Sequence, residues 1–322
     1  MKRSTKVCLI VASALMMFGV LLFTTAMAAT SFNFASGFNM EKYETASYEI
    51  TEKFDSISIY TDTADIDIRP ATDGKVKVLC FEQKNLAHDI SVEGGTLTVK
   101  LVDERRWFEH IGFFNIHSPM ISIYLPEEEY KALNIDADTS DIDVTSDVSF
   151  ESVDIHVSTG DVKCYASVSE TLKIKASTGD VTLDGIRTGA LDITTTTGDI
   201  KANSITCAGD ITLGVSTGEI KFSDVTCKNL ISTGSTGDIT LSSVIATERF
   251  DIERSTGDVN LEACDAASLI ILTDTGEVEG SLLSEKVFVV RTDTGDIDVP
   301  KTTSGGICKI TTDTGDVDIY IK

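Results

Sequence analysis

The chain has 322 residues, of which 42% are hydrophobic, so it is long and apolar enough to bury a substantial core and is not disordered. It carries 51 acidic against 27 basic residues, a formal net charge of −24. A surface this acidic repels nucleic acid and anionic lipid, so we exclude nucleic-acid binding and expect cations or basic groups as partners.

The first forty residues predict a signal peptide or a membrane anchor. Three basic residues precede the apolar run VCLIVASALMMFGVLLF: Lys2, Arg3 and Lys6. Two interpretations are open. The run is long enough to cross a bilayer as one uncleaved helix, whereas the small residues around Ala28 fit a cleavage site, after which the protein would be secreted. Both place the chain from about residue 41 onward outside the cytoplasm.

Residues 41–130 predict a divergent β cap. The stretch ISIYTDTADIDI has apolar residues around Asp65 at the same offsets as the repeats that follow, so it is a divergent copy of them: Ile57, Ile59, Ile66 and Ile68. Alternating strands are expected near KVKVLC, TLTVKL and ISIYLP. We expect them to form an irregular β cap on a regular region that spans 131–322.

A loop rich in aromatic residues, DERRWFEHIGFFNIHSP, lies between two of these strands, with Trp107 near its start. It is either a binding surface or a cover over the open end of the repeats. The four histidines show no metal-ligand spacing: His88, His110, His117 and His156. Because no Walker, G-x-S-x-G or C-x-x-C pattern occurs either, the sequence predicts a protein that is not an enzyme.

An acidic residue recurs every 19 or 20 residues, in nearly every unit behind a Thr-Gly pair. The ten acids are Asp141, Asp161, Asp180, Asp199, Glu219, Asp238, Asp258, Glu277, Asp296 and Asp316. Apolar residues flank them at offsets −8, −6, +1 and +3, which is the spacing of strands with one buried face. Helical spacing is absent from this region.

A further apolar column at offset +6 gives each unit a short third segment that faces inward: Ile186, Ile205, Val225, Val244, Cys264 and Leu283. One such unit cannot bury its apolar face alone, but stacked units form a continuous core. The sequence therefore predicts an all-β fold, a β-solenoid of about ten coils with the irregular cap at its N-terminal end. A series of antiparallel hairpins is the alternative, because Thr-Gly also fits a two-residue turn.

The cysteines fall within this repeat. Cys164, Cys264 and Cys308 occupy inward columns, where a buried thiol behaves as a small hydrophobic group. Cys207 and Cys227 share offset +8 in adjacent coils, where they form either an unpaired ladder or a disulfide.

The acid column has two interpretations. In the first, each carboxylate accepts hydrogen bonds from backbone amides of its own corner, where glycine permits the turn. In the second, the C-terminal corners bind Ca²⁺, because each carries a second acid three residues before the first. The candidate ligands are Asp274, Glu277, Asp293, Asp296, Asp313 and Asp316. No other cofactor is predicted.

The T-G-D repeats, the YLP strand before them and the N-terminal apolar segment together resemble the bacterial putative-adhesin family, a domain of unknown function built from β-strand repeats. The resemblance covers roughly residues 45 to 322. It implies an extracytoplasmic, often membrane-anchored β-solenoid, with some relatives associated with cell-envelope stress. It implies no catalytic residues.

Two functions follow as expectations. The first is a non-enzymatic adhesin or surface-binding scaffold at the bacterial cell envelope, held to the membrane by its N-terminal segment, whose ligand the sequence does not identify. The second is an envelope structural or stress-sensing element that self-associates. The chain ends in GDVDIYIK directly after its last strand, so we expect the C-terminal coil to present an uncapped edge.

Overall fold

A computed structural model describes residues 12–22, 24–25, 43–83, 86–103 and 119–322. The chain divides into two units, Met1–Lys42 and Tyr43–Lys322. In the first unit, residues 12–22 and 24–25 are helical. Within the described ranges, no helix has both the length and the apolar character that crossing a membrane requires. The aromatic loop around Trp107 and the small residues around Ala28 lie outside the described residues.

The second unit consists of strands. Its N-terminal part contains β1 (Tyr43–Ile50), β2 (Ser56–Thr61), β3 (Asp65–Pro70), β4 (Val76–Gln83), β5 (Leu86–Glu93), β6 (Thr96–Asp103) and β7 (Met120–Leu125). The following coils contain β8 (Glu129–Thr139), β9 (Ile142–Val144), β10 (Ser149–Thr159), β11 (Val162–Cys164), β12 (Ser167–Thr178), β13 (Val181–Asp184), β14 (Arg187–Thr197), β15 (Ile200–Cys207) and β16 (Ile211–Thr217). The last coils contain β17 (Ile220–Thr236), β18 (Ile239–Thr256), β19 (Val259–Thr275), β20 (Val278–Leu282), β21 (Lys286–Thr294), β22 (Ile297–Asp298), β23 (Gly306–Thr314) and β24 (Val317–Ile321).

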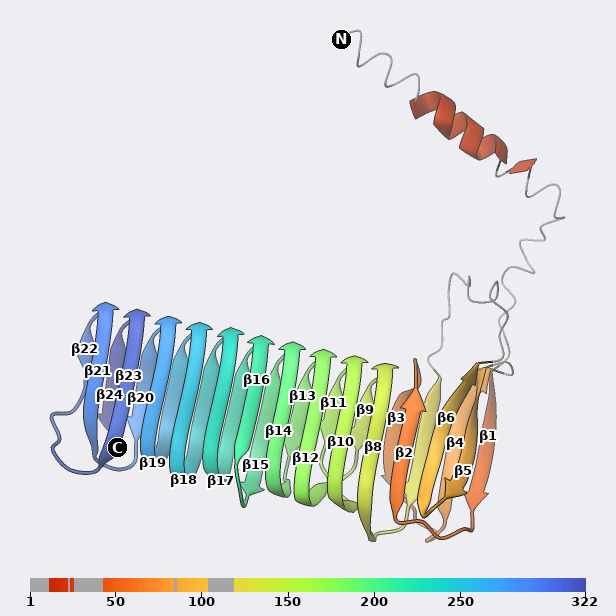
Figure 1. Ribbon diagram of the computed structural model, residues 1–322, viewed down its shortest axis with the longest axis horizontal. Helices are drawn as coiled ribbons and strands as arrows, with labels where there is room; N and C mark the ends of the chain where they lie inside the picture. Colours follow the sequence, from red (N-terminus) through yellow and green to blue (C-terminus); the bar gives the residue numbers. More distant parts are fainter. Residues whose placement is uncertain (1–11, 23, 26–42, 84–85, 104–118) are drawn as a thin grey trace. The chain divides into compact units, whose positions relative to one another are not determined.

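Neighbouring repeats pair in parallel, which confirms the β-solenoid and shows that the hairpin alternative is wrong. Strand β12 pairs with β14 so that Leu172 lies beside Leu191, and β13 pairs with β15 in the same way. Equivalent positions of successive units therefore stack along one axis (Figure 1). The divergent copy around Asp65 joins the same stack, because β2 pairs with β8 and β3 pairs with β9.

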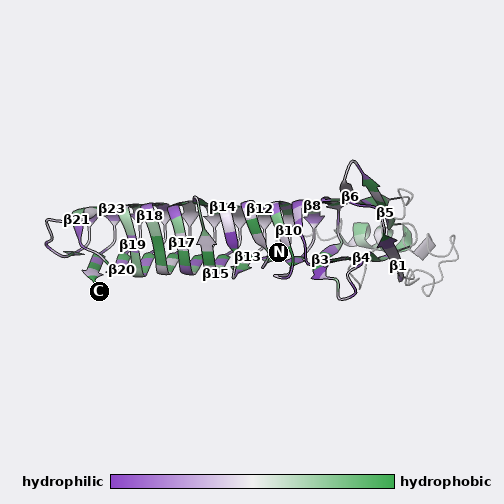
Figure 2. Cartoon of the chain, turned by 90° about the horizontal axis from the view of Figure 1, so that it is seen from below, coloured by the Kyte–Doolittle hydropathy of each residue, from purple (hydrophilic) through white to green (hydrophobic). Residues whose placement is uncertain are grey.

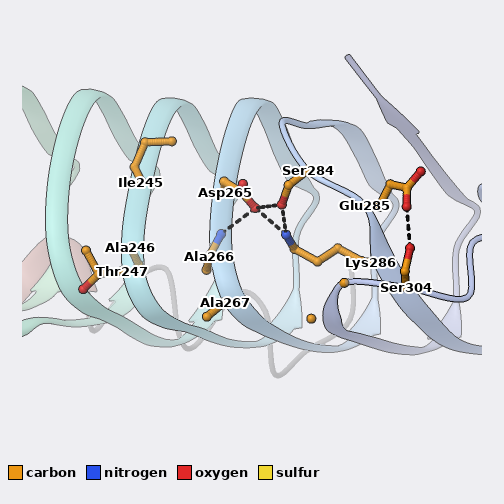
Figure 3. Close-up of a pocket in the computed structure, with 12 residues that line it drawn as sticks. Ile245, Ala246, Thr247, Asp265, Ala266, Ala267, Ser284, Glu285, Lys286 and Ser304 are labelled. Carbon is orange, nitrogen blue, oxygen red and sulfur yellow. Dashed lines mark hydrogen bonds and ion pairs between the residues drawn. The ribbon is translucent and has the colours of Figure 1, made fainter.

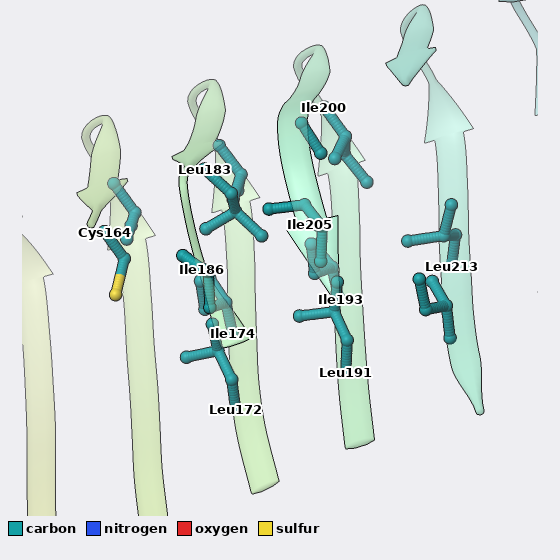
Figure 4. Close-up of a cluster of buried hydrophobic side chains, with 14 of the residues drawn as sticks. Cys164, Leu172, Ile174, Leu183, Ile186, Leu191, Ile193, Ile200, Ile205 and Leu213 are labelled. Atoms are coloured by element: carbon teal, nitrogen blue, oxygen red, sulfur yellow. The ribbon is translucent and has the colours of Figure 1, made fainter. Parts of the chain in front are cut away.

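The predicted inward columns form the core. Side chains of successive coils, among them Ile174, Ile193 and Leu213, lie above one another inside the stack (Figure 4). Polar and apolar residues alternate along the strands (Figure 2). The sequence-based alignment missed one inward column, at offset −4, because several of its members are polar or small: Ala137, Val157, Ala176, Thr195, Val215, Gly234, Arg254, Thr273 and Thr312.

Arg254 explains why the neighbouring coil has the polar Ser232 and the small Gly234 at two of its inward positions. Its guanidinium lies in the core, where Nη2 donates a hydrogen bond to Ser232 Oγ at 3.0 Å. A Cβ at Gly234 would lie 1.8 Å from Arg254 Nη1, so only glycine leaves room for this side chain. Burial lowers the pKa of Arg254 to about 10.

The prediction that Leu283 belongs to the inward column at offset +6 is wrong, because its side chain is 46% exposed, whereas Leu282 is fully buried. Cys264 pairs with Leu282 after a register shift, so this unit has one residue fewer in its turn than the units before it. A one-residue change moves a strand side chain to the opposite face.

The chain order and the spatial order of the coils differ at the C-terminal end. Strand β23 lies between β19 and β21, and β24 lies between β20 and β22. The last coil of the chain is therefore paired on both sides, and the coil of β21 and β22 is at the end of the stack. The expectation that the C-terminal coil presents an uncapped edge is wrong for this reason.

The N-terminal end shows a similar rearrangement. Strand β2 lies between β6 and β8, and β3 lies between β7 and β9. Parallel pairing thus continues across the predicted boundary at residue 130. Beyond these coils, β4 pairs antiparallel with β1 and β7, and β5 pairs antiparallel with β6. These antiparallel strands form the N-terminal end of the solenoid.

The repeated acids connect successive coils. The backbone amide of Asp180 donates to Asp161 Oδ1 at 2.9 Å, and the amide of Asp199 donates to Asp180 Oδ1 at 2.9 Å. The same bond joins Asp141 to Asp65, 76 residues away in sequence, at 3.0 Å. Backbone amides are therefore the partners, as the first interpretation predicts, but each belongs to the neighbouring coil and not to the acid's own corner.

From Asp161 onward, the glycine before each acid is required by contact as well as by backbone conformation. Gly179 has φ +140°, and a Cβ on it would lie 2.0 Å from the carbonyl oxygen of Gly160 in the preceding coil. Any side chain here would separate the two corners and break the bond to the carboxylate. The Thr-Gly-Asp motif therefore allows the backbones of successive corners to pack in direct contact.

Repulsion along the acid column is offset locally. Two carboxylates about 4.8 Å apart repel by roughly 1 kcal/mol in water, whereas a hydrogen bond to a charged acceptor contributes about 1.5–3 kcal/mol. Lys201 Nζ also lies 3.3 Å from carboxylate oxygens of both Asp180 and Asp199. The amide of Glu219 and then this lysine lower the pKa of Asp199.

Replacement of Asp161 by alanine is expected to destabilise the protein by about 1–2 kcal/mol, because the Asp180 amide loses its acceptor at the corner. Asp161→Asn keeps an acceptor oxygen and should lose less. Urea denaturation of the three proteins measures the difference. Glu219→Ala is the matched control. Within the described residues, the backbone amide of Asp238 in the next corner donates no hydrogen bond to the Glu219 carboxylate. Equal losses for Asp161→Ala and Glu219→Ala would contradict the ladder.

The described cysteines are buried and free, which confirms the unpaired interpretation of Cys207 and Cys227. Desolvation raises the pKa of the Cys164 thiol to about 12 from the model-compound value of 9.0. Because the thiol ionises more easily in the unfolded chain, its contribution to stability is fully present below pH 9 and is lost as the pH rises toward 12.

Stability is accordingly expected to fall above pH 9, by up to about 1.4 kcal/mol per pH unit for each such thiol. Urea denaturation between pH 8 and pH 11 measures the slope. The Cys164→Ala variant should show a shallower slope than the unmodified protein. Parallel slopes for the two proteins would show that Cys164 ionises as readily in the folded state as in the unfolded chain.

Candidate binding surface at the C-terminal end of the solenoid

The six predicted calcium ligands are exposed side chains at the corners of the last three coils: Asp274, Glu277, Asp293, Asp296, Asp313 and Asp316. Two of these corners are joined by the ladder, since the amide of Asp296 donates to Asp316 Oδ1 at 2.8 Å. Asp293 is paired instead with Arg291, 2.9 Å away.

A further acid column lies two residues after these corner acids. Glu279 lies beside Asp318, which in turn lies beside Asp298. The repeat register alone places the three acids in one column, and the exchanged coil order puts Asp318 in the middle. Among the described residues, the one group of three or more ligand side chains that approach closely enough for a shared metal ion is elsewhere. Calcium binding at these corners stays a prediction.

A pocket of about 620 Å³ lies on the side of the same coils (Figure 3). It is lined by Ile245, Ala246, Thr247, Asp265, Ala266, Ala267, Ser284, Glu285, Lys286, Ser304, Gly305 and Gly306. A Cβ on Gly306 would lie 1.9 Å from the carbonyl oxygen of Ala267, so the returning C-terminal chain approaches the previous coil through this glycine.

An ion pair organises the wall of the pocket. Lys286 is 2% exposed, and its Nζ lies 2.5 Å from Asp265 Oδ1. The same carboxylate oxygen accepts a hydrogen bond from Ser284 Oγ at 3.0 Å and from the backbone amide of Ala266 at 2.9 Å. Ser284 Oγ also contacts Lys286 Nζ. Nearby, Ser304 Oγ donates to Glu285 Oε2 at 2.5 Å.

The sequence contains a signal for this arrangement that the alignment did not use. Asp265 and Ser284 each stand seven residues after the acid of their unit, so the repeat register places them on neighbouring coils. Lys286 introduces the coil that ends the stack. The pocket therefore combines residues that the repeat brings together with a loop, 299–305, that only the returning chain supplies.

A serine beside a lysine is one form of activated nucleophile, but the surroundings do not suit that chemistry. A general base must be a neutral amine, whereas Lys286 is paired with the Asp265 carboxylate. The carboxylate instead fits the ammonium form and completes its hydrogen bonds. The group is therefore suited to holding two coils together and to presenting polar atoms to a ligand.

The same coils also expose apolar side chains and an open strand edge. Strand β21 pairs with β23 on one side and with no other strand of the described structure. Because no further coil covers this end, the core columns are partly open to solvent: Ile297 is 47% exposed. Val289 and Ile307 on the outer face are 54% and 56% exposed.

The comparisons place the chain in a family. Residues 54–214 and 208–322 match the Toastrack DUF4097 family, and the chain belongs to it. This match confirms the resemblance that the T-G-D repeats indicate, to the putative-adhesin domain of unknown function. Among curated proteins, no match is found.

Several crystal structures are similar over most of their length. A "putative adhesin" from Bacteroides fragilis is 17% identical, covers 87% of this chain and 98% of its own, and has a TM-score of 0.44. A "putative lipid binding protein" from Parabacteroides distasonis is 17% identical, with coverage of 87% and 98% and a TM-score of 0.45. A "putative adhesin" from Parabacteroides merdae is 13% identical, with coverage of 87% and 97% and a TM-score of 0.43.

Removal of the Asp265 carboxylate leaves the Lys286 ammonium buried without a partner. Asp265→Ala is expected to destabilise the protein by about 2–3 kcal/mol, below the range for a fully buried pair because the Asp265 side chain is 22% exposed. The double variant Asp265→Ala/Lys286→Met should recover most of this loss, since no charge then remains buried. Thermal or urea denaturation of the three proteins measures it, and additive losses would contradict the pairing.

Proposed function

We propose that this protein is a non-enzymatic, extracytoplasmic repeat protein that binds a surface ligand at the bacterial cell envelope with the C-terminal end of its solenoid. The observation that carries the proposal is the gathering of four features in the last coils: the pocket beside Lys286, the unpaired edge of β21, the exposed apolar residues and the acid columns. The coils before them repeat one structural corner.

The position of this end supports a role in presentation. Within the second unit, β1 begins at Tyr43 at one end of the stack, and the coil of β21 and β22 is at the other (Figure 1). If the N-terminal segment is anchored in the membrane, the chain enters the solenoid from it at β1, and the C-terminal coils form the opposite end of the stack. The anchor, or secretion after cleavage near Ala28, belongs to this proposal.

Binding of the full chain to intact bacterial cells and to purified cell walls tests the function. The variant Ala267→Trp fills the pocket from an exposed position and should reduce binding at least tenfold. The matched control is Ala208→Trp, an exposed alanine at the same repeat position three coils earlier. Binding that is lost equally in both variants, or in neither, would contradict a site at the C-terminal end.

Self-association is the second candidate, and the unpaired edge of β21 favours it. An open edge that carries Val289 is a template for pairing with another chain. Light scattering of the full chain should then show dimers or larger assemblies that Val289→Lys disrupts, while Thr240→Lys, in the paired strand β18, leaves them intact. A strict monomer at high concentration would rule this function out without affecting the first.

A further inference from the structure

The N-terminal end of the solenoid contains a second group of functional side chains, unrelated to the proposed binding surface. Cys80 and Glu82 lie two residues apart on β4, and His88 lies on β5, which follows β4 along the chain. All three are buried, and one ligand atom from each lies within 4.8 Å of the others. No metal-ligand spacing in the sequence indicates this group, because His88 stands six residues after Glu82 and lies on another strand.

The hydrogen bonds of the group orient its ligand atoms. Glu82 Oε2 accepts from the backbone amide of His88 at 2.7 Å and lies 2.9 Å from His88 Nδ1. The other ring nitrogen, Nε2, lies 3.3 Å from Thr61 Oγ1 on β2. Metal-bound histidines commonly have such a partner on the nitrogen that does not bind the metal, because it fixes the ring orientation. Thr61 can fill that place.

The donor set selects a class of ion. A thiol sulfur, an imidazole nitrogen and a carboxylate oxygen together are characteristic of zinc sites, whereas calcium and magnesium prefer oxygen alone. In a tetrahedral zinc site the nitrogen and oxygen ligands are about 3.3 Å apart, so Nδ1 and Oε2 need to separate by only about 0.4 Å. The sulfur lies within 4.8 Å of both atoms, and since its distance to them in a tetrahedral site is about 3.6 Å, it needs to move by no more than about 1.2 Å.

Charge balance also favours a divalent ion. One thiolate and one carboxylate carry two negative charges, which a single Zn²⁺ neutralises, so the buried site has no net charge. Binding releases the thiol proton to water, and the neutral imidazole keeps its one proton on Nε2, which faces Thr61, so that Nδ1 can bind the ion and no other reactant is needed. The Glu82 side chain retains 8% exposure, which gives solvent a limited approach to the group.

We propose that Cys80, Glu82 and His88 bind one Zn²⁺ ion, with water in the remaining position, and that this ion fastens β4 to β5 at the N-terminal end of the solenoid. Within the described residues, the strand pairing between β4 and β5 consists of one residue pair, Gln83 with Leu86, so backbone hydrogen bonds alone join the two strands weakly. A metal ion bound to side chains of both strands would supply the missing link.

The test uses the full chain with metal alone as the probe. Addition of Co²⁺ should produce one equivalent of thiolate-to-cobalt charge-transfer absorption, which Zn²⁺ displaces, and Zn²⁺ should raise the unfolding temperature. Cys80→Ser should abolish the absorption and His88→Gln should weaken Zn²⁺ binding at least tenfold, with folding of each variant checked by circular dichroism. Cys164→Ser removes an equally buried thiol outside the group and should change neither readout.

Two outcomes would overturn the proposal. One is the absence of charge-transfer absorption from the folded, reduced protein. The other is absorption that persists in Cys80→Ser or disappears in Cys164→Ser. If Cys80→Ser does not fold, loss of Zn²⁺ affinity in folded His88→Gln decides in favour of the site, and unchanged affinity decides against it.

Discussion

One hydrogen bond, from the backbone amide of a corner to the carboxylate of the preceding corner, determines how this solenoid is built. The chain must turn sharply after each inward strand, and at the turn the amide of the acid cannot join the regular strand ladder. An aspartate of the neighbouring coil reaches it at 2.8–3.0 Å. This bond holds neighbouring corners in contact. From Asp161 onward the contact is close enough to require glycine before the acid, and the period of 19 or 20 residues follows from returning the chain to the same corner.

The same constraint separates structural residues from candidate functional ones. Of the six acids predicted to bind calcium, Asp316 is the one that accepts a corner amide within the described residues. We place the proposed function where the repeat ends. There the chain first forms the coil of β21 and β22 at the end of the stack. It then returns, so that β23 and β24 lie between this coil and the coil of β19 and β20. The pocket beside Lys286 exists because of this return.

Much of the fold could be predicted from the sequence, because the inward columns and the acid spacing depend on local periodicity alone. Periodicity also assigns Asp65 to the stack, although it stands 76 positions before Asp141. It failed where the register changed by one residue, at Leu283, and where the inward residue was an arginine accommodated by a glycine, at Arg254. It could not reveal the exchanged order of the last two coils, since both have the same repeat pattern. The group of Cys80, Glu82 and His88 depends on how an irregular pair of strands meets, which no repeat encodes.

Amide hydrogen exchange at the corners tests whether the carboxylate ladder holds the coils together. The amides of Asp180, Asp199 and Asp258 donate to an aspartate of the preceding coil. The preceding residue in the stack is a glutamate for Asp238 and Asp316, and no hydrogen bond from either amide is found within the described residues. We expect slow exchange at the amides of Asp180, Asp199 and Asp258, and exchange at least tenfold faster at those of Asp238 and Asp316. Equal protection at all five would show that the carboxylate ladder does not hold the coils together.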